Sequence, residues 1–115
     1  MMKTAFLYDD VFLEHETGDG HPERAERLRT ILRRLEAGGY LDRLITVPIR
    51  TADDRHLELI HKKEYIERVR RGIESGEEFF DSVDNTVCTR TYHVALSAVG
   101  GCLNMCDTVM SGKAS

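Results

Sequence analysis

Apolar side chains recur at helical spacing in three long stretches of the chain. In residues 22–37, leucine, isoleucine and alanine return every three or four positions while glutamate and arginine fill the other face. This pattern predicts an amphipathic helix that ends at the glycine pair Gly38-Gly39, since glycine tolerates the left-handed conformation after a helix. Residues 63–75 repeat the pattern and stop at Gly76. Residues 91–111 carry few charges and many small side chains, so we expect a helix that is buried on most sides.

Two short apolar runs predict strands. Residues 4–8 are apolar and partly aromatic, and residues 44–49 are rich in isoleucine, leucine and valine. Pro48 cannot donate a backbone hydrogen bond, so the second strand is expected to lie at a sheet edge or to end there. Residues 52–60 predict a short helix with an acidic start, and the mixed, acidic residues 76–89 predict a long loop.

This order of elements, a strand, a helix, a strand and then three helices, is typical of an α/β domain with a parallel sheet. Two strands make a thin sheet, because an isolated strand pair is only marginally stable in water. Helices that are rich in leucine, isoleucine and valine also need a sheet face to cover. We therefore expect the N-terminal part of a larger α/β protein, whose uncovered apolar surface makes self-association possible.

Composition narrows the functional classes. The 115 residues suffice for one domain. Sixteen lysines and arginines against 20 aspartates and glutamates give a net charge of −4, which argues against a dedicated nucleic-acid surface. No apolar run is long enough for a membrane span, and no secretory signal is visible. The odd count of 3 cysteines favours a reducing, cytoplasmic setting over a disulfide framework.

Candidate chemistry is concentrated in residues 15–28, where a histidine-bearing loop leads into the first predicted helix. Gly18 and Gly20 let the backbone turn sharply, and His21 is held extended by the proline that follows it. Pro22 suits the first helical position, since its missing N–H would be unbonded there. A shaped loop anchored by a stiff helix is a place where binding groups tend to lie.

Residues 21–27 read His-Pro-Glu-Arg-Ala-Glu-Arg and resemble an opening segment of the zinc-dependent histone deacetylase superfamily, which includes acetylpolyamine amidohydrolases and acetoin-utilisation proteins. Residues 59–66, 81–86 and 91–101 resemble three further segments of that family in the same order. Ala25 stands where the family usually has a second proline. Four matches in the right order are far more specific than any single motif, and the resemblance covers essentially the whole chain.

The resemblance implies an arginase–deacetylase-type α/β fold and hydrolysis of the acetyl amide of acetyl-lysine, an acetylpolyamine or a similar substrate. In the family, the zinc ligands and catalytic histidines lie beyond the position that matches Ser115. Residues 1–115 would then be the N-terminal segment of one catalytic domain, supplying substrate-tunnel and rim loops but no zinc ligand and no activity of its own. The alternative is a non-enzymatic binding or assembly module derived from the family.

The resemblance also implies roles for particular residues. Arg27 matches an arginine at the inner end of the substrate tunnel, where a planar guanidinium suits departing acetate, although its pattern also fits a solvated helix face. Asp84 matches a rim aspartate that accepts hydrogen bonds from substrate backbone N–H groups. Asp81 is a second candidate for that rim acid, and a loop aspartate in a turn is the structural alternative. His21 and Pro22 are expected in the substrate-binding loop.

Two pairs of residues resemble metal ligands by spacing alone. Asp54 and His56 fit an Asp-x-His pair, but they open a polar helix, where an aspartate is favoured by the helix dipole. Cys102 and Cys106 lie one helical turn apart, and two cysteines on an apolar face usually pack.

Other histidines and the third cysteine are expected to have structural roles. His15 and His21 flank a loop without a cysteine, so ordinary loop hydrogen bonding is expected of them. His61 and His93 lie on predicted helices and are expected in the core or on the surface. Cys88 could reach the other cysteines only through a fold that the pattern does not predict.

Overall fold

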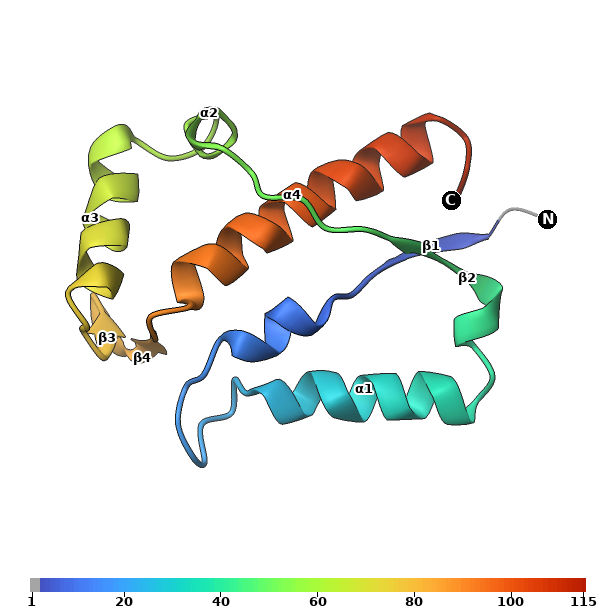
Figure 1. Cartoon of the computed structure of the whole chain (residues 1–115), viewed down its shortest axis with the longest axis horizontal. Helices are drawn as coiled ribbons and strands as arrows, with labels where there is room; N and C mark the ends of the chain where they lie inside the picture. Colours follow the sequence, from blue (N-terminus) through green and yellow to red (C-terminus); the bar gives the residue numbers. More distant parts are fainter. Residues whose placement is uncertain (1–2) are drawn as a thin grey trace.

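The computed structural model describes residues 3–115, which form a two-stranded parallel sheet, a small hairpin and four α-helices (Figure 1). In the parallel sheet, β1 (Thr4–Leu7) pairs with β2 (Leu44–Val47), and Ala5 lies opposite Ile45. Both predicted strands are confirmed, although each is shorter than predicted. The second strand ends at Val47, and the carbonyl of the following Pro48 accepts a hydrogen bond from the Asn104 side chain (2.8 Å).

Helix α1 (Ala25–Ala37) connects the two strands and begins later than the sequence predicts. Pro22 is not its first residue, because the chain first makes a turn in which the Thr17 hydroxyl donates to the Glu23 carbonyl. The Glu23 amide donates to Nδ1 of His21 (3.0 Å) within the same turn. The predicted glycine stop is confirmed: Gly39 has a φ of 68°, in the left-handed region that glycine adopts without strain.

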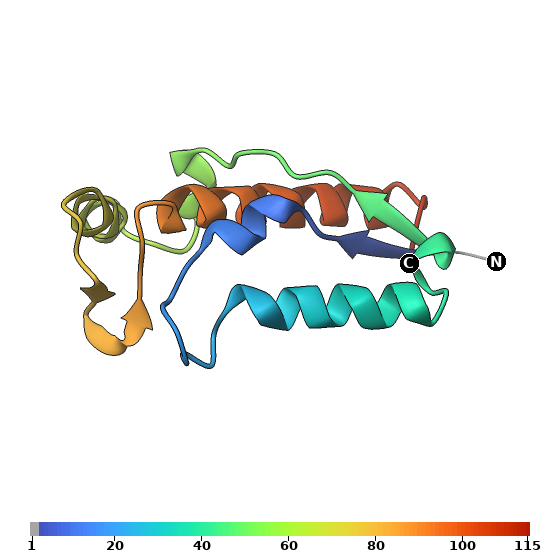
Figure 2. The same ribbon diagram turned by 60° about the horizontal axis from the view of Figure 1, so that its bottom comes forward.

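Helix α4 (Thr91–Met110) and helix α1 lie on opposite sides of the two strands (Figures 1 and 2). The small core between α4 and the sheet consists of Ala5, Val47 and Ala114, with Met105 packed against it. Gly100 brings α4 close to the chain after β2, since a Cβ at this position would lie 1.7 Å from the Arg50 carbonyl oxygen. The absence of a side chain therefore permits this packing.

The prediction that α4 is buried on most sides is wrong. One face is buried, through Val94, Ser97 and the two adjacent glycines. Cys102 and Cys106 are exposed, so the prediction that they pack is also wrong. The small residues that suggested burial all round instead allow a close approach on one side. Within residues 3–115, no helix combines the length and apolar character needed to cross a membrane.

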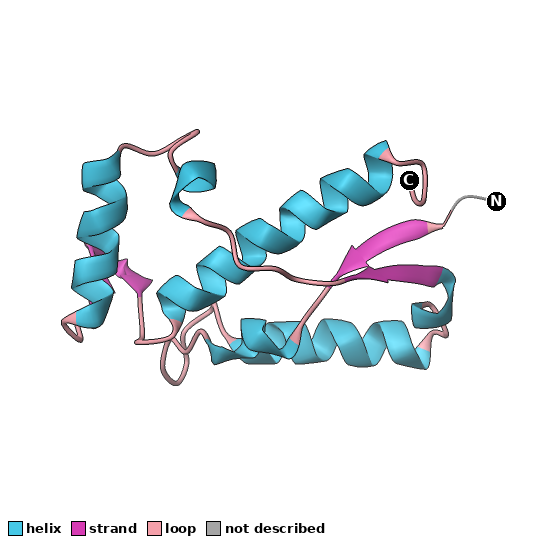
Figure 3. Ribbon diagram, turned by 45° about the horizontal axis from the view of Figure 1, so that its top comes forward, coloured by secondary structure: helices cyan, strands magenta, loops and turns pink. Residues whose placement is uncertain are grey.

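Helices α2 (Asp54–Leu57) and α3 (Lys63–Glu74) follow β2, and α2 is shorter than predicted. The prediction of a long loop over residues 76–89 is wrong, because these residues contain an antiparallel hairpin of β3 (Phe79–Phe80) and β4 (Ser82–Thr86). Its turn is at Asp81, which has a φ of 61°. Strands this short give no period-two pattern that a sequence could reveal. Figure 3 shows the hairpin beside α3 and far from the parallel sheet.

Candidate functional site

Two loops that are far apart in the sequence meet at the N-terminal end of α4. The first is the chain before α1, which contains Glu14. The Glu14 Oε2 accepts a hydrogen bond from Nε of Arg90, the residue before α4 (2.7 Å). His15 Nδ1 lies 2.8 Å from the Thr91 hydroxyl oxygen in the same region. The second is the segment that connects β4 to α4. The histidine-bearing loop is thus bonded to residues 88–91, which follow the hairpin and begin α4.

Cys88 joins these two loops. Its Sγ accepts a hydrogen bond from the Glu16 amide (3.4 Å), and the Thr91 hydroxyl donates to it at the same distance. Partial burial by itself raises the pKa of a thiol, but these hydrogen bonds, with those from the amides of Arg90 and Thr91, hold the pKa of Cys88 below its ordinary value. No local sequence pattern predicts this contact, because Cys88 and Glu16 are 72 residues apart.

Asp84 lies in the middle of β4 and is exposed. Its amide donates to the Ser82 hydroxyl (3.0 Å), while within residues 3–115 its carboxylate enters no hydrogen bond or ion pair. This differs from a turn aspartate, whose carboxylate accepts from a nearby backbone amide. The Asp84 carboxylate is therefore available to accept hydrogen bonds from another molecule.

Asp81 is engaged within the protein. Its two carboxylate oxygens lie 2.5 Å and 3.3 Å from the two terminal nitrogens of Arg68 on α3. A two-point pair of this kind fixes the orientation of both groups. Of the two aspartates considered from the sequence, Asp81 is therefore held by α3, whereas no such partner of the Asp84 carboxylate is found within residues 3–115.

Arg27, His21 and Pro22 lie together on the other loop and on α1. The Arg27 side chain is 57% exposed and forms an ion pair with Glu23, one turn earlier. It borders an open hollow of about 320 Å³ with Ile31. No hydrogen bond or ion pair within residues 3–115 joins Arg27 to Asp84. In this chain the structure brings His15 to the start of α4, whereas His21 forms the turn before α1.

The Asp-x-His pair has the structural role expected of it, with one correction. Asp53, and not Asp54, precedes the helix and forms its capping box with His56, whose Nδ1 accepts a hydrogen bond from the Asp53 amide (3.3 Å). Asp54 is the first helical residue and accepts a hydrogen bond from Arg70 on α3 (2.9 Å). His61 and His93 are exposed.

Metal-binding side chains do not converge in this part of the protein. Over the described range 3–115, no group of three or more histidine, cysteine, aspartate or glutamate side chains could hold a metal ion. Structural and catalytic zinc sites need at least three protein ligands, so these residues do not fit a complete zinc site.

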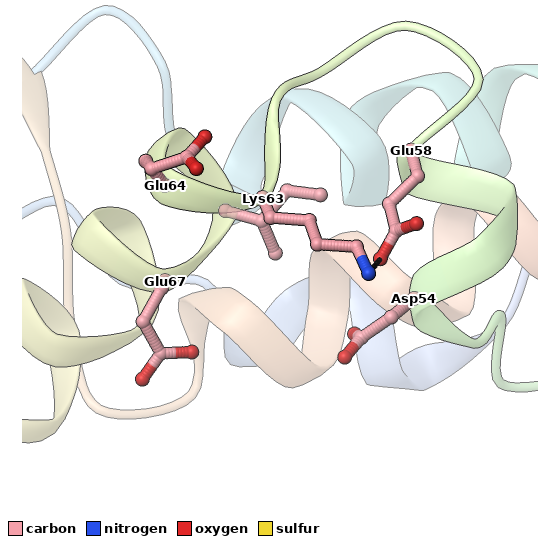
Figure 4. Close-up of a pocket in the computed structure, with 6 residues that line it drawn as sticks. Asp54, Glu58, Lys63, Glu64 and Glu67 are labelled. Carbon is pink, nitrogen blue, oxygen red and sulfur yellow. Dashed lines mark ion pairs between the residues drawn. The ribbon is translucent and has the colours of Figure 1, made fainter.

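A charged hollow of about 430 Å³ separates α2 from α3 (Figure 4). Lys63 lines this hollow together with four carboxylates, those of Asp54, Glu58, Glu64 and Glu67. Lys63 Nζ lies 3.7 Å from Glu58 Oε1, and Arg70 binds both Asp54 and Glu67. Ion pairs across the hollow therefore join the two helices, an arrangement that no pattern in the sequence predicts.

Comparisons with known proteins agree on one family. The sequence model of the histone deacetylase domain matches residues 21–115. The acetoin utilization protein AcuC of Staphylococcus aureus is 32% identical over 99% of this chain and 31% of its own length. Histone deacetylase 5 of Arabidopsis thaliana is 34% identical over 59% of this chain and 11% of its own length.

The solved structure of the HDA15 HD domain superimposes on the whole chain with a TM-score of 0.88 and 25% identity, and the chain covers 34% of that structure. The α/β architecture is thereby confirmed. The chain spans about a third of the length of AcuC and of the HDA15 domain.

Proposed function

Because the chain belongs to the histone deacetylase domain family, we propose that it is the N-terminal segment of a zinc-dependent amidohydrolase. The enzyme would remove acetyl groups from acetyl-lysine, an acetylpolyamine or a similar amide. The observation that carries the proposal is that the histidine-bearing loop is bonded to the start of α4, directly after the hairpin whose strand β4 carries Asp84.

In such an enzyme the zinc supplies a Lewis acid that polarises the amide carbonyl and activates water. Side chains within residues 3–115 do not fit a zinc site, so we assign them to substrate binding alone. We expect the isolated chain to be inactive. Its three cysteines are all free in the structure, which supports a reducing, cytoplasmic location as part of the proposal.

Asp84 would bind the substrate at the rim. An ionised carboxylate is an acceptor with two oxygens, so it can take two N–H groups of an extended acyl-lysine or acyl-polyamine chain. Its exposure at the middle of β4 leaves both oxygens accessible. His21 and Pro22 would shape the opposite loop. Arg27 would lie further in, exchanging its exposed ion pair with Glu23 for contact with departing acetate.

The test uses Asp84→Ala and Asp84→Asn in a deacetylase-domain protein that contains this segment. Two substrates are compared, an acetyl-lysine peptide and a minimal acetamide that does not reach the rim. We expect kcat/KM for the peptide to fall. The corresponding loss of transition-state stabilisation should be about 1–3 kcal/mol, the scale of a charge-assisted hydrogen bond. The acetamide should lose much less.

Glu78→Gln is the matched control, because Glu78 is an exposed carboxylate at the base of the same hairpin. It removes one negative charge without touching the proposed binding group. Equal losses for Glu78→Gln and Asp84→Asn would show that only net charge matters. Equal losses on both substrates would make Asp84 a structural residue, and an unmodified protein inactive on both would favour a non-enzymatic binding module.

A further inference from the structure

The guanidinium of Arg70 connects three helices. From α3 it donates to Asp54 Oδ1 on α2 (2.9 Å) and to the Tyr92 hydroxyl oxygen on α4 (3.0 Å). It also donates to Glu67 on its own helix (3.1 Å) and lies 5.1 Å from the centre of the Tyr92 ring. The side chain is only 29% exposed. Figure 4 shows two of the partners, Asp54 and Glu67, on the two sides of the hollow.

This arrangement uses properties that are specific to arginine. A guanidinium is planar and offers several N–H donors in fixed directions, while one face stacks on an aromatic ring. Hydrogen bonds to Tyr92 and then to Asp54 raise the pKa of Arg70 above its ordinary value. A lysine has a single flexible ammonium and could not satisfy the three partners in this geometry.

Helix α3 in turn holds the hairpin. Arg68 pairs with Asp81 at the hairpin turn and lies 4.8 Å from the centre of the Phe80 ring. Phe80 of the hairpin also lies against α3 at Gly72, where a Cβ would meet the Phe80 ring at 3.5 Å, an ordinary contact distance. Asp84 lies in β4, three residues after Asp81 at the turn. Any shift of α3 relative to α4 would therefore move Asp84.

We propose that Arg70 is a positioning residue for the substrate-binding rim, fixing α3 against α4 so that the hairpin presents Asp84 to substrate. The inference rests on the proposed function and deepens it. Arg70 does not touch the substrate. It acts through Tyr92 at one end and through the Arg68 contact with the hairpin at the other.

The test uses Arg70→Met in the same deacetylase-domain protein, with Arg71→Met as the matched control. Arg71 is the next residue on α3, is 76% exposed and, within residues 3–115, pairs only with Glu67 of its own helix. We expect Arg70→Met to lower kcat/KM for the acetyl-lysine peptide by roughly tenfold, mainly through KM, and to leave the acetamide nearly unchanged. Arg71→Met should leave both substrates unchanged.

Two further measurements separate positioning from general destabilisation. In an Asp84→Ala background, Arg70→Met should cause no additional loss on the peptide, because the group that it positions is gone. Amide hydrogen exchange over residues 79–87 should be faster in Arg70→Met than in Arg71→Met. If Arg70→Met does not fold, Tyr92→Phe serves instead, since it removes only the hydroxyl that accepts from Arg70.

The outcomes are distinguishable. Equal losses on both substrates, additive losses with Asp84→Ala, or unchanged hairpin exchange would each overturn the role of Arg70 while leaving the proposed function intact. An unmodified protein that hydrolyses neither substrate would refute the proposed function and, with it, the role of Arg70 in substrate binding. Hydrogen exchange would then still report whether Arg70 holds the hairpin.

Discussion

Replacing Gly100 by alanine should destabilise the protein, because it pushes α4 away from the chain that follows β2. The new Cβ would lie 1.7 Å from the Arg50 carbonyl oxygen and 2.5 Å from its carbonyl carbon. These are backbone atoms, so no side-chain rotation can relieve the overlap. The nearby hydrogen bond from the Ala52 amide to the Leu96 carbonyl (3.1 Å) would be lost or lengthened as the segments separate.

The expected free-energy change follows from three effects. Overpacking usually costs about 1–3 kcal/mol, and the upper end applies where the obstacle is backbone. Losing the Ala52 hydrogen bond adds about 1 kcal/mol. Alanine gains about 1 kcal/mol over glycine in helix propensity. The net expectation is a loss of about 2–3 kcal/mol in the free energy of unfolding.

Urea unfolding followed by circular dichroism measures this change. Cys102→Ala is the matched control, since Cys102 is exposed on the same helix and its replacement should alter stability by less than about 0.5 kcal/mol. Gly101→Ala should fall between them, because its Cβ would meet the Leu7 side chain at 2.7 Å. If Gly100→Ala were as stable as Cys102→Ala, the close packing of α4 on the Arg50 segment would be refuted.

Three other predictions follow from the same structure. Arg27→Ala in a deacetylase-domain protein should lower turnover of the peptide and the acetamide alike; unchanged rates in a folded protein would leave Arg27 as a surface charge. Thr91→Val should raise the pKa of Cys88 by removing a hydrogen bond to the thiol, so the pH profile of its alkylation, measured with Cys102 and Cys106 replaced by serine, should shift upward. Residues 1–115 alone should self-associate, because α1 buries none of its apolar residues fully; a concentration-independent melt of a strict monomer would contradict this.

Local patterns in the sequence determined the helices and the parallel strands. The apolar spacing of residues 25–37 and the glycines after them suffice to place α1, because period and stop signal lie within one segment. The start of that helix was misplaced, since a contact between Thr17 and Glu23 holds Pro22 in a turn. The hairpin was missed because its strands are too short to show a period.

Only the tertiary structure decided which side chains share a site. The two candidate aspartates are three residues apart and look alike in sequence, but Arg68, on another element, pairs with Asp81, whereas the Asp84 carboxylate has no partner within the described residues 3–115. Cys88 meets the histidine-bearing loop across more than 70 residues. The physical reason is that hydrophobic period and turn chemistry act between neighbours in the chain, whereas hydrogen bonds and ion pairs between elements depend on how those elements pack.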